Sequence, residues 1–184
     1  MFLISIVLGA AGVVAAAAWN RHVEAAKAEA AAPAKHLAPS LDLAAQLPLA
    51  AVAPLRGLGY TTVIDLRPDG EAPDQPPSSE IAMAAKAAGL SFHYVPVPHG
   101  EIPEAAVVAL RKALDASPPG PVLIYCRSGR RAARTWALVE SQRPAGLTTD
   151  AIIAAVREAG QEADDLRERL DAGVSKRVSS KTGA

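Results

Sequence analysis

From about Pro48 onward, apolar and polar positions alternate between strand-like and helix-like segments. Short β-branched or apolar runs predict strands over residues 60–66, 91–97 and 121–125. The stretches between and after them predict helices over residues 48–58, 78–89, 103–116, 132–141, 149–159 and 161–170. Because helices and strands alternate, the pattern predicts an α/β fold with a small, mainly parallel sheet flanked by helices.

Proline, glycine and serine mark the boundaries of these segments. The loop from Arg67 to Pro77 is rich in Pro, Asp and Gly, and Ser78 or Ser79 is expected to cap the helix after it. Pro103 falls at the first turn of a later helix, where proline costs no hydrogen bond. The apolar run 121–125 is bounded by proline and by a polar loop, so it is the expected central strand.

The amino terminus carries a separate apolar run over residues 2–18. About 18 such residues reach the lower limit for crossing a bilayer. Basic residues follow this run instead of preceding it, which favours an uncleaved anchor with a cytoplasmic domain over a signal peptide. If the run is a signal peptide, the domain is periplasmic or secreted. The membrane is therefore an expected partner of this segment.

These patterns divide the chain into four parts. We expect a membrane anchor or signal segment over residues 1–19 and a helical stalk and linker over residues 20–39. The folded α/β domain is expected over residues 40–171, followed by a flexible polar tail over residues 172–184.

Composition narrows the classes of function. Acidic and basic residues balance at 19 each, so no large single-sign field draws the chain to nucleic acid. The single cysteine, Cys126, excludes an intramolecular disulfide and a C-x-x-C metal site. The sequence shows no metal site and no dinucleotide-binding fingerprint, so we expect no cofactor and no nucleic-acid partner.

Cys126 directly follows the expected central strand and is the candidate nucleophile. Ligands of parallel sheets gather at the carboxyl ends of the strands, which is where Cys126 lies. A lone cysteine in an apolar strand can be inert packing, but the arginine-rich residues after it are a poor composition for a core. Only a few per cent of an ordinary thiol is ionised at neutral pH, so Arg127 is expected to help hold the thiolate.

The residues after Cys126 are suited to binding an anion. Backbone N–H groups of the loop and of the first helical turn can converge on one ligand, and a glycine permits the turn that this requires. Arg131 adds a planar charged fork that fits tetrahedral oxyanions, whereas Arg130 is the arginine best explained as a surface charge. The expected substrate-binding residues of this loop are Arg127, Ser128, Gly129, Arg130 and Ala132.

A second group of charged residues follows the predicted strand over residues 60–66. Asp65 and Arg67 are expected at the same edge of the sheet as Cys126. Two interpretations stay open: they line the same pocket, or they belong to an Asp/Gly/Pro turn with a local ion pair.

Three stretches, VIDLRPDGEAPDQPPSSEI, FHYVPV and PVLIYCRSGRRAARTWAL, resemble the phosphatase-like domain of beta-lactamase hydrolase-like proteins over roughly Leu41 to Gly160. The resemblance implies a protein-tyrosine-phosphatase-like fold, similar to that of dual-specificity phosphatases. It also implies a cysteine loop similar to that of single-domain rhodaneses, and some members are named sulfurtransferases. Related domains occur fused to persulfide-oxidising metallo-hydrolase-like domains.

The length of the loop favours sulfur chemistry. A protein phosphatase places its arginine after five intervening residues, whereas Arg131 comes after four. The resemblance places a general acid in the loop before the helix that precedes the cysteine strand. His99 and Glu101 are the candidates there, and each can equally be an exposed loop residue. Sulfur transfer needs no such acid because its leaving group is already stable.

The favoured interpretation is a sulfurtransferase that forms a persulfide on Cys126. Its substrate would be a small anion, thiosulfate or a persulfide, bound by the loop amides and Arg131. The first alternative is a phosphatase that hydrolyses phosphomonoesters through a phosphocysteine, with Glu101, His99 or a carboxylate of the Asp65 loop as general acid. The second alternative is a non-catalytic redox-sensing or anion-binding module.

Overall fold

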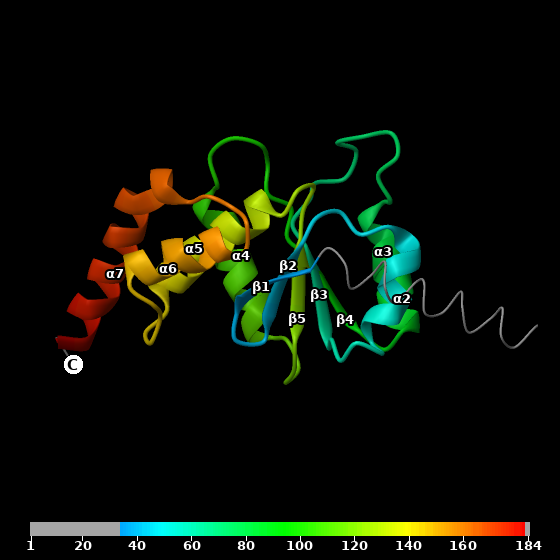
Figure 1. Cartoon of the computed structure of the whole chain (residues 1–184), viewed down its shortest axis with the longest axis horizontal. Helices are drawn as coiled ribbons and strands as arrows, with labels where there is room; N and C mark the ends of the chain where they lie inside the picture. The colour runs from blue at the N-terminus through cyan, green and yellow to red at the C-terminus, as the bar shows by residue number, and fades with distance from the viewer. Residues whose placement is uncertain (1–33, 183–184) are drawn as a thin grey trace, which may run out of the picture.

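The computed structural model describes residues 34–182, which form a five-stranded sheet with helices on both faces (Figure 1). The strands are β1 (Lys35–Ala38), β2 (Leu41–Ala44), β3 (Thr62–Asp65), β4 (Ser91–Tyr94) and β5 (Val122–Tyr125). The α-helices are α2 (Val52–Leu55), α3 (Ser78–Ala87), α4 (Glu104–Asp115), α5 (Arg130–Gln142), α6 (Thr149–Glu158) and α7 (Arg167–Thr182). Two short 3-10 helices complete the set, η1 (Leu49–Ala51) and η2 (Asp164–Leu166).

The sheet has the strand order β1-β2-β5-β3-β4, with β5 in the centre. The pairs β2–β5, β5–β3 and β3–β4 are parallel, and β1–β2 is antiparallel. This confirms the predicted α/β fold with a mainly parallel sheet and the central place of the cysteine strand. Asp65 pairs with Tyr125 in the register of β3 and β5, so Leu66 and Cys126 leave the sheet at the same edge.

The hairpin of β1 and β2 was not predicted, and it corrects the expected linker over residues 20–39. β1 lies within that range and pairs with β2 as part of the sheet. Leu37, Leu41 and Leu43 are buried, and Ser40 makes the turn with a positive φ of 59°. The strands read KHLA and LDLA, and neither contains the β-branched or aromatic residues that mark β3, β4 and β5.

The expected flexible tail over residues 172–184 is wrong for its described part, because α7 continues to Thr182. Gly173 allows α7 to pack closely against Ser141 of α5. Further along, the guanidinium of Arg177 donates to the backbone oxygens of Glu140, Arg143 and Leu147. These contacts hold a polar sequence in a helix that has little apolar surface of its own.

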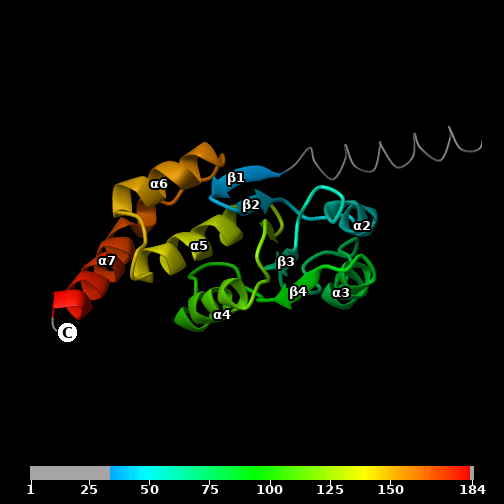
Figure 2. The same ribbon diagram turned by 90° about the horizontal axis from the view of Figure 1, so that it is seen from below.

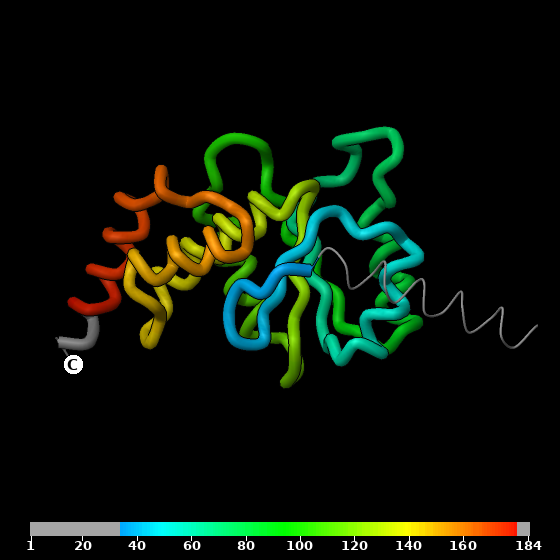
Figure 3. Tube along the Cα trace, viewed as in Figure 1, coloured from blue at the N-terminus to red at the C-terminus, as the bar shows by residue number. Residues whose placement is uncertain are grey.

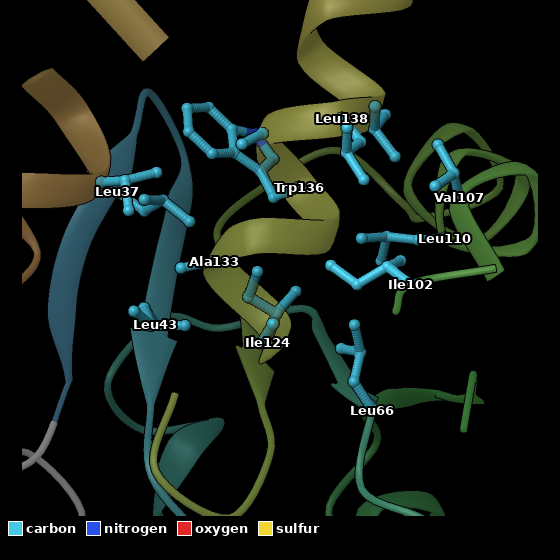
Figure 4. Packing of buried hydrophobic residues seen from close by; sticks show 14 of the residues in the cluster. Leu37, Leu43, Leu66, Ile102, Val107, Leu110, Ile124, Ala133, Trp136 and Leu138 are labelled. Atoms are coloured by element: carbon cyan, nitrogen blue, oxygen red, sulfur yellow. The ribbon is translucent and has the colours of Figure 1, made fainter. Parts of the chain in front are cut away.

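Two hydrophobic clusters hold the sheet between its helical layers (Figure 2). The larger cluster lies against α4, α5, α6 and α7. Figure 4 shows Ile124 of β5 and Leu66, the residue after β3, beneath Trp136 and Leu110. The smaller cluster lies on the opposite face, against α2 and α3. Cys126 belongs to the larger cluster and Tyr125 to the smaller one, as expected for neighbours at the end of a strand.

Three loops gather at one end of the sheet (Figure 3). The turn after β5 lies between the loop over residues 67–77 and the segment over residues 95–103, both of which rise beyond the sheet in this view. The carboxyl ends of β3 and β5 thus bring together segments that are far apart in the sequence.

The predicted anchor or signal segment over residues 1–19, and the stalk as far as residue 33, lie outside the described residues. From residue 34 to residue 182, no helix is both long enough and apolar enough to cross a membrane.

Candidate active site

The candidate nucleophile lies between the central strand and the first turn of α5. Cys126 is only 1% exposed, and Gly129 precedes α5 in the left-handed conformation, with a φ of 87°. The N–H of Ala133 donates to the carbonyl oxygen of Gly129 at 2.9 Å, which is the first bond of the helix. The N–H groups before Ala133 have no partner within the helix, so they are available to an anion at the loop.

The loop is packed closely against its neighbours at Gly129. A Cβ atom added there would come within 3.3 Å of Leu43 Cγ and within 3.4 Å of the Ala44 carbonyl oxygen. On the same side, the Gln161 side chain donates to the carbonyl oxygen of Ser128 at 3.1 Å. The backbone conformation therefore favours glycine at this position, and a side chain there would also be tightly packed against its neighbours.

The other residues predicted to bind substrate differ in their exposure. Arg127, Ser128 and Arg130 are exposed, and Ala132 is fully buried, so Ala132 can offer a ligand only its backbone N–H. Within residues 34–182, neither Arg127 nor Arg130 makes a side-chain hydrogen bond that fixes it beside the sulfur. The role of Arg127 in holding the thiolate stays a prediction.

Arg131 is the cation that the structure brings to Cys126. Its side chain is 12% exposed and interacts with the Cys126 side chain. Its Nη1 and Nη2 donate to the two carboxylate oxygens of Glu71 at 2.6 and 2.7 Å, and Nη1 also donates to the Val97 carbonyl oxygen at 2.7 Å. The guanidinium is thus fixed by partners from two other loops.

Glu71 receives contacts from three cationic or titratable side chains. Besides Arg131, Arg67 donates to it through Nε at 3.1 Å, and His99 Nε2 lies 3.3 Å from its Oε1. The hydrogen bonds from Arg131, above all, lower the pKa of Glu71 to about 2, against the opposing effect of burial. Glu71 is therefore a permanent anion at neutral pH and cannot serve as a proton donor.

Arg67 connects this carboxylate to the start of the cysteine loop. It is buried, and its Nη1 donates to Gln46 Oε1 at 2.8 Å. The backbone N–H of Gln46 donates in turn to the carbonyl oxygen of Arg127 at 3.2 Å. We call the resulting set of residues the loop clamp. It consists of Arg127, Gln46, Arg67, Glu71 and Arg131.

The loop over residues 67–77 is itself tied down by hydrogen bonds. Asp69 accepts from the backbone N–H and the hydroxyl of Ser78 at 2.7 and 2.6 Å, and its own N–H donates to the Tyr94 hydroxyl at 2.9 Å. The predicted serine cap is wrong: Ser78 is the first residue of α3, and the Asp69 carboxylate satisfies its N–H from outside the helix. Gln75 closes the loop through Glu71 N–H and the Pro68 carbonyl oxygen.

One interpretation of the sequence placed Asp65 and Arg67 in the lining of one pocket with Cys126. The structure does not bring both side chains to that pocket. Asp65 is buried on the face of the sheet that carries Tyr125, opposite to Cys126, and its Oδ1 accepts from the Arg67 N–H at 2.8 Å. Burial raises the pKa of Asp65 to about 6. Asp65 therefore supports the turn, while Arg67 reaches the site through Glu71.

The structure separates the two candidate general acids. Glu101 is 90% exposed, and its carboxylate lies 4.0 Å from Arg169 Nη1 of α7. The His99 side chain is 70% exposed, yet it contacts Glu71 beside Arg131. Of these two residues, only His99 therefore contacts Glu71, the carboxylate that also holds Arg131.

Sequence reasoning missed the roles of Glu71 and Gln46. A usable signal was that Arg67 and Glu71 lie in one short Asp/Gly/Pro loop, since a turn can bring such a pair together. No local signal pairs Glu71 with Arg131, which lies 60 residues further along the chain.

Comparison with known proteins gives consistent results. Residues 33–145, more than half of the chain, match the family model of the phosphatase-like domain of beta-lactamase hydrolase-like protein. A beta-lactamase hydrolase-like protein of Xylella fastidiosa is 45% identical over 82 residues, which are 45% of this chain and 19% of that protein. This chain thus spans about a fifth of the length of that relative.

Solved structures show the same fold. A crystal structure described as a candidate phosphatase from Neisseria meningitidis is 32% identical, with a TM-score of 0.65, and the match covers 76% of this chain and 96% of the other. The core catalytic domain of a PP-IP phosphatase from S. cerevisiae, in complex with citrate, is 19% identical with a TM-score of 0.54. That match covers 82% of this chain and 92% of the yeast domain, and it shows likeness of fold alone.

Proposed function

This chain belongs to the family of the phosphatase-like domain of beta-lactamase hydrolase-like proteins, and from this we propose that it is a phosphatase that uses Cys126 as its nucleophile. The observation that carries the proposal is the guanidinium of Arg131, which Glu71 and the Val97 carbonyl oxygen fix at the amino end of α5, within electrostatic reach of Cys126. A cysteine, a fixed guanidinium and free helix N–H groups are the parts that phosphoryl transfer to a thiolate requires.

The reaction has two displacements. The Cys126 thiolate attacks phosphorus, the bond from phosphorus to the leaving oxygen breaks, and that oxygen takes a proton from a general acid. In the second step, water gives a proton to the group that acted as general acid, and its oxygen attacks phosphorus. The bond from phosphorus to sulfur breaks, which releases inorganic phosphate and returns the Cys126 thiolate. Arg131 and the loop amides stabilise the charge on the equatorial oxygens in both steps.

We assign the general acid to His99. It lies beside Glu71, whereas Glu101 is directed toward Arg169 of α7. The Nε2 atom of His99 lies 3.3 Å from Glu71 Oε1, and Glu71 in turn accepts from Arg131, so the imidazole is placed at the site by geometry. The Asp65 carboxylate, the third candidate, lies on the far face of the sheet, away from the sulfur.

The substrate class follows from the charge of the site and from its relatives. The yeast neighbour binds citrate, a small anion with several charges, in its catalytic domain. We propose that small phosphomonoesters bind here in the same manner, with Arg127 and Arg130 exposed at the rim of the loop to meet further negative charge.

Sulfur transfer, which the sequence favoured, becomes the second candidate. The one observation in its favour is the loop with four residues between Cys126 and Arg131. The family and the Neisseria structure are both described as phosphatase-like or as phosphatases, which supports phosphoryl transfer instead.

Intact mass spectrometry separates these candidates. The full chain and a Cys126→Ser variant are incubated with an aryl phosphate or with thiosulfate, quenched rapidly and weighed. We expect turnover of the aryl phosphate and a trapped phosphoryl adduct on the wild type alone. A sulfur adduct without phosphate turnover would instead establish the sulfurtransferase. Absence of both reactions, with anion binding retained in a Cys126→Ala variant, would favour a non-catalytic module.

A further inference from the structure

We propose that Glu71 is a positioning residue, which turns Arg131 so that one edge of its guanidinium is presented to the oxyanion bound at Cys126. The inference rests on the proposed function, because it names how that site is held. In this role Glu71 does not contact the substrate and acts only by orienting Arg131.

The donors of Arg131 support this role. A guanidinium has five N–H donors in a rigid plane. Both hydrogens of Nη1 are used, by Glu71 and the Val97 carbonyl oxygen, and one hydrogen of Nη2 is used by Glu71. The two remaining donors, on Nε and Nη2, lie along one edge and meet no oxygen within residues 34–182. Since Arg131 also interacts with Cys126, we infer that this free edge faces the sulfur.

The loop clamp makes the arrangement rigid. Glu71 is 11% exposed and is held by Arg67, which is held by Gln46. Gln46 returns to the cysteine loop through the carbonyl oxygen of Arg127. The two ends of the loop, Arg127 and Arg131, are therefore fixed by one continuous set of hydrogen bonds.

The clamp also accounts for the short loop. Arg131 is the second residue of α5 and comes after only four residues beyond Cys126. Its side chain leaves a helical turn whose direction the loop cannot adjust freely. A partner outside the loop is needed to set the plane of the guanidinium, and Glu71 supplies two fixed hydrogen bonds for this.

A different role for Glu71, as an occupant of the anion site, predicts the opposite change in oxyanion affinity when Glu71 is removed. If Glu71 occupied the anion site as a mimic of substrate, its removal would free Arg131 and tighten oxyanion binding. If Glu71 positions Arg131, its removal leaves the guanidinium free to rotate. Oxyanion binding then weakens, because the anion must bear the entropic cost of ordering the Arg131 side chain. The direction of the change in affinity decides between the two.

Calorimetric titration of the full chain with sodium tungstate, a tetrahedral oxyanion, provides the test. We expect Glu71→Gln to raise the dissociation constant about tenfold or more. Glu71→Asp, which keeps the charge on a shorter side chain, should recover part of the affinity. The matched control is Asp74→Asn, which removes an exposed carboxylate from the same loop and should leave the affinity unchanged.

Each outcome bears on the proposal. Equal or tighter tungstate binding by folded Glu71→Gln would overturn it while leaving the phosphatase assignment intact. Absence of tungstate binding by the wild type would overturn the oxyanion site itself. If Glu71→Gln does not fold, as judged by circular dichroism, Glu71→Asp decides: unchanged affinity in that variant would also contradict a positioning role.

Discussion

The carboxylate of Glu71 accepts two hydrogen bonds from the guanidinium of Arg131, across 60 residues of sequence. This pair joins the loop after β3 to the first turn of α5, directly beside the candidate nucleophile. The pair consists of a carboxylate whose pKa is lowered to about 2 and a guanidinium held by that carboxylate and by the Val97 carbonyl oxygen.

Replacing Arg131, the proposed catalytic arginine, should show how much its two parallel N–H donors contribute to the reaction. Arg131→Lys keeps the charge but loses the planar pair of donors, so we expect kcat/KM for an aryl phosphate to fall about 100-fold or more. Arg157→Lys is the matched control, because Arg157 lies on α6 and pairs with Asp164 at the surface. A loss of less than about threefold in Arg131→Lys would show that the loop amides alone bind the phosphoryl group.

The assignment of His99 can be tested through the leaving group. His99→Asn should lower kcat for an alkyl phosphate about 100-fold, because an alkoxide needs a proton as it departs. Its effect on an activated aryl phosphate should be much smaller, since that leaving group is stable without a proton. The same pair of substrates with Glu101→Gln should show little difference, and a large leaving-group effect in that variant would move the assignment to Glu101.

The sequence predicted the centre of the fold because its signals are local. The run over residues 121–125 is apolar, bounded by proline and a polar loop, and it forms the central strand β5. The hairpin of β1 and β2 escaped prediction because its strands contain no β-branched or aromatic residue, and β2 joins the sheet through its pairing with β5. The continuation of α7 to Thr182 was not predicted either, because its support comes from distant residues. Arg177 donates to backbone carbonyl oxygens at the end of α5 and in the segment after it.

The candidate site divides in the same manner. Cys126, Gly129 and Arg131 could be proposed from the sequence because they occupy one short stretch with a recognisable chemistry. The support from Glu71 was not found, because the choice of its partner depends on how two distant loops meet. The position of Asp65 was also beyond reach, since the face of a strand residue relative to Cys126 depends on the pairing register.

Asp65 should make stability depend on pH in an uncommon direction. Burial raises its pKa from 3.8 to about 6, so between about pH 4 and pH 6 the folded state holds a proton that the unfolded state has released. The free energy of unfolding should therefore decrease through this window by an amount on the order of 3 kcal/mol at most, and level off above it.

Urea unfolding between pH 4 and pH 7.5 measures this effect by comparison with Asp65→Asn. Asparagine keeps an oxygen for the Arg67 N–H, so the variant lacks the titration and retains the contact. We expect Asp65→Asn to gain stability relative to the wild type as the pH rises from 4 to 7. Parallel curves for the two proteins would show that Asp65 titrates in the folded state as it does in the unfolded state.

Gly129→Ala should damage both the fold and the site, and the two effects can be separated. The positive φ of 87° disfavours any Cβ by about 1–2 kcal/mol, and the added atom would also lie 3.3 Å from Leu43. Gly89→Ala is the control, because Gly89 has a similar φ of 72° with open space around it. We expect Gly129→Ala to lower the melting temperature more than Gly89→Ala does. Only Gly129→Ala should weaken tungstate binding, because only it moves the loop amides. Equal melting temperatures and unchanged tungstate affinity would mean that the loop tolerates a side chain and that its backbone does not form the anion cradle.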